Sequence, residues 1–113
     1  GKPMREFLHV DDMADACVFL MDTYAGNDFV NIGTGEDITI RELTEMVALT
    51  VGYQGEIVWD HTKPDGAPRK LLDVSRLHAL GWRHRHSLHE GLMASYQDFI
   101  RSQPSVPPEV NSP

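Results

Sequence analysis

The chain has 113 residues, a length that suits one compact domain and leaves no room for a second independent core. Seventeen acidic residues against ten basic ones give a formal net charge of −7, which argues against nucleic acid or an acidic membrane surface as the main partner. The single cysteine, Cys17, excludes a disulfide framework, and no apolar run reaches the roughly 20 residues of a membrane span. The first residues contain no apolar segment of the signal-peptide kind, so we expect a soluble, cytoplasmic protein.

The first third of the chain predicts a short strand, a helix and a second short strand. Glu6–Val10 is rich in β-forming residues, and Asp11 or Asp12 can cap the helix that follows. The apolar residues of this helix recur at helical spacing and form one stripe, made by Met13, Cys17, Leu20, Met21 and Tyr24. The second strand is expected at Phe29–Ile32, directly before the turn Gly33–Gly35.

The best-marked element is a helix predicted over residues 40–51. Thr39 and Glu42 have the T-x-x-E spacing of a capping box, in which each side chain bonds the other residue's backbone N–H. Gly52 follows at the position where glycine adopts the left-handed conformation that ends a helix. Local chemistry therefore defines both ends of this helix.

The next segment predicts a strand, a rigid loop and a short helix. Glu56–Trp59 is the third strand candidate, and Lys63–Pro68 is a loop in which two prolines fix the backbone. Asp73 is expected to cap a short helix that stops at Gly81.

A second capping box, Ser87 with Glu90, opens the last predicted helix. Its apolar stripe consists of Leu88, Leu92, Tyr96 and Phe99. From residue 103 to 113 four prolines and few apolar side chains predict a disordered tail. The chain is thus expected to be an α/β segment over residues 1–102, with about four helices and three short strands.

The strongest candidate for a ligand site is a cluster of basic residues around the proline-containing loop. Lys63, Arg69 and Lys70 flank Asp65, and Arg5 is a further isolated cation just before the first predicted strand. Loop prolines lower the entropy cost of holding charged side chains in place, and arginine can clamp a pyrophosphate with two parallel hydrogen bonds. The alternative is that these are ordinary solvated surface charges.

Other chemical motifs are absent or incomplete. His84, His86 and His89 have no carboxylate or cysteine at ligand spacing, so no metal site is predicted. His9 is expected to be structural. Gly33–Gly35 lacks the third glycine of a dinucleotide-binding turn, and none of the tyrosines is followed four residues later by lysine. We therefore predict no catalytic, cofactor or metal site within this chain.

Pro3–Ala14 reads P-M-R-E-F-L-H-V-D-D-M-A, and Lys63–Asp73 reads K-P-D-G-A-P-R-K-L-L-D. These segments resemble motifs of GDP-L-fucose synthases, a family of extended short-chain dehydrogenases/reductases. Pro3–Ala14 is similar to the strand-to-helix segment that follows the catalytic tyrosine in this superfamily. Lys63–Asp73 is close to the more specific K-P-D-G-x-P-R-K-x-x-D segment of the family, and the similarity extends over nearly all of residues 1–102. It implies the C-terminal, substrate-binding part of such an enzyme, without the N-terminal Rossmann portion.

The resemblance also implies a function. Enzymes of the family convert GDP-4-keto-6-deoxy-D-mannose to GDP-L-fucose by epimerising C3 and C5 and reducing the C4 ketone with NADPH. Their substrate contacts correspond to Arg5, Asp65 and Lys70. We expect Lys63 and Arg69, the other members of the basic cluster, as second-tier contacts. The cofactor turn and the catalytic Ser-Tyr-Lys set of the family would lie upstream of Gly1. The expected role is binding of a GDP-sugar by a part that is inactive alone, with NADP(H) bound in the whole enzyme.

Two alternatives stay open. The chain could be a non-catalytic module that binds partners or oligomerises, or it could be the same part of an enzyme acting on another nucleotide sugar. In a whole enzyme of this class the stripe at Met13, Cys17 and Leu20 and the segment Phe29–Ile32 would pack against the nucleotide domain. Because exposed apolar faces recruit other chains, we expect a homo-oligomer.

Overall fold

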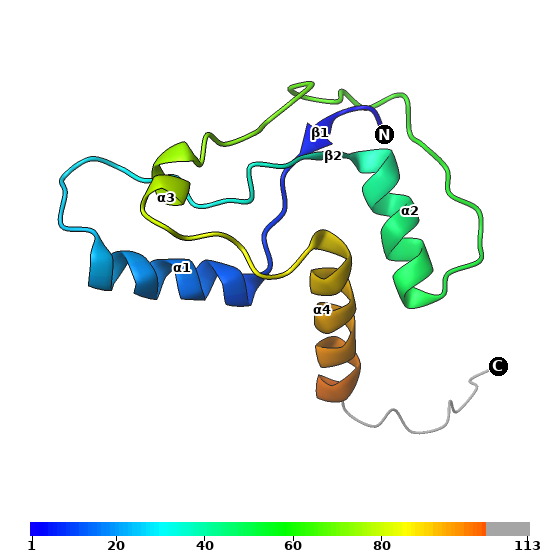
Figure 1. Cartoon of the computed structure of the whole chain (residues 1–113). Helices are drawn as coiled ribbons and strands as arrows, with labels where there is room; N and C mark the ends of the chain where they lie inside the picture. Colours follow the sequence, from blue (N-terminus) through cyan, green and yellow to red (C-terminus); the bar gives the residue numbers. More distant parts are fainter. Residues whose placement is uncertain (104–113) are drawn as a thin grey trace.

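The computed structural model describes residues 1–103. The described part contains four helices and two short strands, which confirms the predicted α/β character (Figure 1). In chain order these are β1 (Met4–Arg5), α1 (Val10–Thr23), β2 (Ile38–Thr39), α2 (Ile40–Val51), α3 (Ser75–Ala79) and α4 (Leu88–Ser102). The predicted tail lies, from residue 104 onward, outside the described residues.

The two helices with capping boxes begin where the sequence predicts. At α2 the Thr39 hydroxyl accepts a hydrogen bond from the Glu42 backbone N–H at 3.1 Å, and the Glu42 carboxylate accepts one from the Thr39 N–H at 3.3 Å. Gly52, with φ of 75°, ends the helix in the left-handed conformation. Ser87 and Glu90 make the same reciprocal pair at the start of α4. These ends depend only on residues three apart, so the predicted bounds of α2 are confirmed.

The predicted strand positions were wrong. None of Glu6–Val10, Phe29–Ile32 and Glu56–Trp59 forms a strand. Instead β1 pairs antiparallel with β2, placing Met4 opposite Thr39 and Arg5 opposite Ile38. A strand requires a partner, and β propensity alone does not say where along the chain that partner lies.

Two predicted helix caps also differ. Helix α1 begins at Val10, and its cap is His9, whose Nδ1 accepts a hydrogen bond from the Asp11 backbone N–H at 3.1 Å. This agrees with a structural role for His9. In helix α3 the N-cap position is Val74, whose side chain makes no capping hydrogen bond, and the Asp73 carboxylate accepts one from the Ser75 N–H at 2.9 Å. The cap positions shifted because an imidazole nitrogen or a neighbouring carboxylate can also satisfy the first backbone N–H groups.

The main apolar core lies between α1 and α3. Ala16, Leu77 and Trp82 are buried there, and five partly buried side chains pack around them: Leu8, Phe19, Leu20, Val30 and Ile32. Most of the predicted α1 stripe faces away from this core: Cys17 is exposed, and Met13 and Met21 are 40% and 83% exposed, whereas Leu20 packs against the core. Helical periodicity identifies an apolar face but not the surface that covers it.

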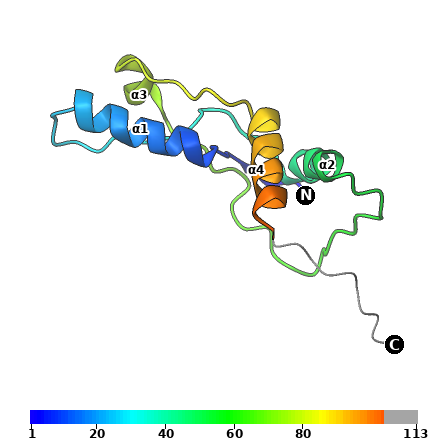
Figure 2. The ribbon, with the colours of Figure 1, turned by 90° about the horizontal axis from the view of Figure 1, so that it is seen from below.

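The elements are arranged openly. Helices α1 and α3 lie at one end, α2 and α4 at the other, and the segment between α2 and α3 runs along one side (Figures 1 and 2). The radius of gyration is 18.3 Å, compared with roughly 13 Å for a compact domain of about 100 residues. Such an open fold leaves apolar surface exposed. Strand β1 nevertheless holds β2 and the segment 68–70 together at the centre of the chain.

Candidate functional site: a basic hollow beside strand β1

Strand β1 brings the basic residues of two distant segments together. The Met4 N–H donates a hydrogen bond to the Pro68 carbonyl at 2.9 Å, and the Lys70 N–H donates one to the Met4 carbonyl at 3.2 Å. Met4 also forms a parallel bridge with Arg69. The segment 68–70 consequently runs along one edge of β1, while β2 occupies the other edge.

An open hollow of about 610 Å³ lies at this junction, and we call it the basic hollow. It is lined by Arg5, Glu6, Arg69, Lys70, Leu71 and Leu72. Three of the five predicted ligand residues, Arg5, Arg69 and Lys70, are thus brought together. Lys63 and Asp65 are exposed on the preceding loop and do not line the hollow.

Arg5 is held by its own strand and by the loop. Its Nη1 donates a hydrogen bond to the Met4 carbonyl at 2.7 Å, which uses one of the five N–H donors of a guanidinium group. Its Nη2 lies 3.8 Å from the point where a Cβ at Gly66 would be, and Gly66 has a φ of +77°. Glycine at this position permits the left-handed turn of the loop, and a distance of 3.8 Å is an ordinary van der Waals contact.

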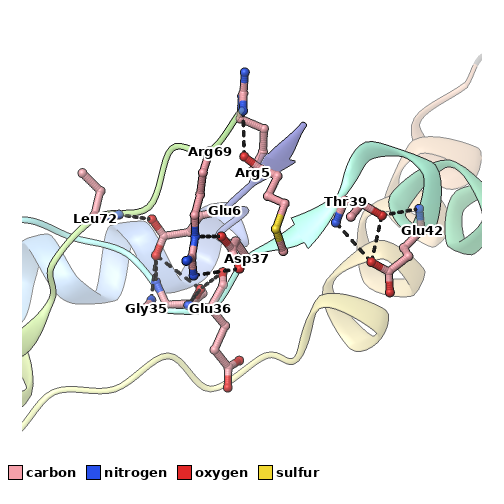
Figure 3. Close-up of polar contacts among 11 residues, drawn as sticks. Arg5, Glu6, Gly35, Glu36, Asp37, Thr39, Glu42, Arg69 and Leu72 are labelled. Carbon is pink, nitrogen blue, oxygen red and sulfur yellow. Dashed lines mark hydrogen bonds and ion pairs between the residues drawn. The ribbon is translucent and has the colours of Figure 1, made fainter. Parts of the chain in front are cut away.

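Glu6 joins three segments beneath the hollow, a role that the sequence did not reveal. One carboxylate oxygen accepts hydrogen bonds from the backbone N–H groups of Thr34 and Gly35, at 2.9 and 2.6 Å. The other accepts one from the Leu72 N–H at 3.1 Å (Figure 3). A carboxylate that accepts several backbone N–H groups is a strong, charge-assisted link. Glu6 thereby ties the glycine turn and the segment after Lys70 to β1.

Arg69 is engaged by Asp37, which the sequence also did not single out. Arg69 Nε lies 2.6 Å from Asp37 Oδ2, and Arg69 Nη2 lies 3.4 Å from Asp37 Oδ1 (Figure 3). The Asp37 side chain is only 8% exposed, whereas that of Arg69 is 59% exposed. This two-pronged pair uses guanidinium N–H donors that would otherwise be available to a ligand. Arg69 lines the hollow, but part of its guanidinium group is directed to Asp37.

A second polar cluster, formed by His9, Asp12 and His86, lies away from the basic hollow. Buried Asp12 accepts hydrogen bonds from the backbone N–H groups of Arg85 and His86, at 3.2 and 2.9 Å, and lies 3.0 Å from His86 Nδ1. The ring of His86 stacks on that of His9, with centroids 4.4 Å apart. Burial by itself would raise the pKa of Asp12, but the bonds from His86 and Arg85 outweigh it and lower the pKa below its ordinary value.

Within residues 1–103, no three His, Cys, Asp or Glu side chains converge in a way that could hold a metal ion. His86, one of the three histidines considered as ligands, instead bonds Asp12. None of the helices in the described part of the chain is long and apolar enough to cross a bilayer.

Comparison with known proteins supports the class suggested by the sequence. The profile of the NAD dependent epimerase/dehydratase family matches residues 1–33. A reductase of GDP-6-OMe-4-keto-L-xylo-heptose from C. jejuni superposes with a TM-score of 0.82 at 35% identity, covering 90% of this chain and 32% of that one. The GDP-mannoheptose C4 reductase MlghC from Campylobacter jejuni, solved with NADP bound, superposes with a TM-score of 0.73 at 39% identity. This match covers 88% of this chain and 32% of the reductase. The fold is that of a segment of extended short-chain dehydrogenases/reductases.

Within that class the predicted resemblance to GDP-L-fucose synthases is confirmed. The chain is 56% identical over 102 residues to the putative GDP-L-fucose synthase 2 of Arabidopsis thaliana, a match that covers 90% of this chain and 31% of the relative. The chain therefore spans about a third of the length of the curated relatives it matches.

Proposed function

We propose that this chain is the sugar-nucleotide-binding part of an NADPH-dependent enzyme that epimerises and reduces GDP-4-keto-6-deoxy-D-mannose to GDP-L-fucose. The observation that carries the proposal is the basic hollow, where Arg5 and Lys70 line one cavity in a chain of net charge −7. An acidic protein must neutralise a diphosphate locally, and this junction concentrates the required donors. The GDP-sugar names of its relatives support the same substrate class.

The residues of the hollow and of the loop before it have distinct proposed roles. Arg5 offers a planar fork of donors that can bind two phosphate oxygens at once, while Lys70 supplies a compact point charge. Asp65, on the exposed loop before the hollow, contacts the neutral part of the ligand. Lys63 adds a second-tier positive charge on the same loop. The cations Arg5, Lys70 and Lys63 thus bind the ligand through its diphosphate and leave the sugar free to reach the reacting groups.

Binding the diphosphate matters for the chemistry because it fixes the sugar. Positioning a reactant can contribute about 7 to 11 kcal/mol to lowering a barrier, provided that the reacting groups are held together. When bound, NADPH supplies the hydride that reduces the C4 ketone. The sequence of this chain contains neither a Gly-rich dinucleotide turn nor a Tyr-x-x-x-Lys pair. We therefore propose that residues outside this chain bind NADPH, and that the chain alone is inactive.

The first test compares three nucleotides by isothermal titration calorimetry. We expect the chain to bind GDP and not NADPH, and to produce no GDP-L-fucose from the keto-sugar nucleotide, because the cofactor and catalytic motifs are missing. UDP is the matched control for the base. Equal affinity for GDP and UDP would favour another nucleotide sugar as substrate. Formation of GDP-L-fucose by the purified chain with consumption of NADPH would overturn the proposed inactivity.

A second candidate function, association through exposed apolar faces, has its own supporting observation. Val10 and Met21 on α1, and Phe29 in the segment after this helix, are 70%, 83% and 78% exposed. Apolar side chains of this size gathered on an open fold favour contact with another chain. We expect light scattering of the purified chain to report a dimer or larger assembly. A constant mass of about 12.7 kDa over a wide range of concentration would contradict this.

A further inference from the structure

The geometry of the basic hollow points to Asp37 as a positioning residue. We propose that Asp37 binds Arg69 to fix the segment that presents Lys70 beside Arg5, and that Arg69 acts through this contact and not as a direct diphosphate ligand. The inference rests on the proposed function for the identity of the ligand. The sequence alone placed Arg69 among the substrate contacts.

The contact between Asp37 and Arg69 spans strand β1. Asp37 immediately precedes β2, which pairs with one edge of β1, whereas Arg69 bridges Met4 at the other edge. The ion pair therefore crosses from one neighbour of β1 to the other (Figure 3). Arg69 Nε lies 2.6 Å from Asp37 Oδ2, so this ion pair holds both neighbours against the strand that carries Arg5.

The burial of the two partners shows which of them depends on the contact. Asp37 has an 8% exposed side chain, so its carboxylate has lost most of its water and needs the guanidinium group. Arg69 is largely exposed, so water can solvate its charge when Asp37 is removed. Replacement of Asp37 is thus the cleaner perturbation, because it leaves no uncompensated buried charge.

The two possible roles of Arg69 predict opposite signs for the Asp37→Ala variant. If Arg69 is a direct ligand, removing Asp37 frees its donors and also removes a negative charge near the diphosphate, so GDP binds more tightly. If Asp37 is a positioning residue, the segment 68–72 becomes less ordered and GDP binds more weakly in spite of the favourable charge change. We expect weakening by about threefold to tenfold, the range of a partly exposed, two-pronged ion pair.

Glu36→Ala is the matched control. It removes the same charge one residue earlier, and the side chain of Glu36 is exposed and directed away from Arg69 (Figure 3). We expect this variant to bind GDP as the wild type does or slightly more tightly, because only the long-range charge has changed.

The experiment combines calorimetry with GDP and amide hydrogen exchange of the Lys70 N–H, which bonds the Met4 carbonyl. We expect Asp37→Ala to weaken GDP binding and to accelerate exchange at Lys70, and Glu36→Ala to do neither. Tighter or unchanged GDP binding in Asp37→Ala, or unchanged exchange at Lys70, would overturn the positioning role. Absence of GDP binding in the wild type would contradict the proposed function of this chain, while exchange at Lys70 would still decide the role of Asp37.

Discussion

Replacing Arg5 by alanine is expected to weaken GDP binding about ten- to a hundredfold, since a charge-assisted hydrogen bond contributes roughly 1.5 to 3 kcal/mol. Arg5 lines the basic hollow, and the hydrogen bond from its Nη1 to the Met4 carbonyl orients its guanidinium group. Arg5→Lys should recover only part of the affinity, because an ammonium group cannot reproduce a two-pronged contact.

Calorimetry with GDP on the wild type and both variants measures this effect. Arg85→Ala is a suitable control, because Arg85 is an exposed arginine whose side chain lies 3.9 Å from Asp15, outside the hollow. It removes the same charge and should leave GDP affinity nearly unchanged. Equal affinities for wild type, Arg5→Ala and Arg5→Lys would exclude Arg5 from the site.

Replacing Asp12 by alanine is expected to lower the free energy of unfolding by about 3 kcal/mol, because it leaves hydrogen-bond donors of the segment before α4 without their acceptor. Asp12 is 2% exposed and accepts hydrogen bonds from the backbone N–H groups of Arg85 and His86. Denaturation by urea measures the loss. Asp11→Ala, at the exposed neighbouring position, should change stability by a few tenths of a kcal/mol. Similar losses in both variants would contradict a special role for Asp12.

The same cluster predicts a pH dependence. Because the folded pKa of Asp12 is lower than its ordinary value of 3.8, the folded state binds this proton less readily than the unfolded state. The stabilisation is therefore complete above the ordinary value and is lost as the pH falls through the lower, folded pKa. Asp12→Asn should reduce the slope of stability against pH in this acidic range. An unchanged slope would show that other carboxylates dominate acid unfolding.

The helix ends were predictable because their determinants are local. The capping boxes at Thr39 and Ser87 lie within one helical turn, so the sequence alone locates the starts of α2 and α4. The strands were not predictable in this way, because β1 finds its partners at residues 38–39 and 69. The positions of the strands therefore depend on pairing between distant segments, which β propensity does not reveal.

The site was predictable in part for the same reason. Arg5 and Lys70 were singled out as cations near the loop prolines and as residues of segments that resemble a known family, and both line one hollow in the structure. Their role as ligands stays a prediction. Glu6 and Asp37 were missed because their partners, Leu72 and Arg69, lie far along the chain. An acidic residue next to a candidate ligand arginine is a weak signal that could have drawn attention to Glu6.

The most direct test of the proposed role of the basic hollow is a titration of GDP into the isotopically labelled chain, followed residue by residue through its amide NMR signals. We expect the largest shifts at Arg5 and Lys70, which line the hollow, and at Gly66, which lies next to the Arg5 guanidinium group. The amides of α4, which contributes no residue to the hollow, should change little. Saturable shifts that are largest along α4, with Arg5 and Lys70 unaffected, would contradict a diphosphate site at this hollow.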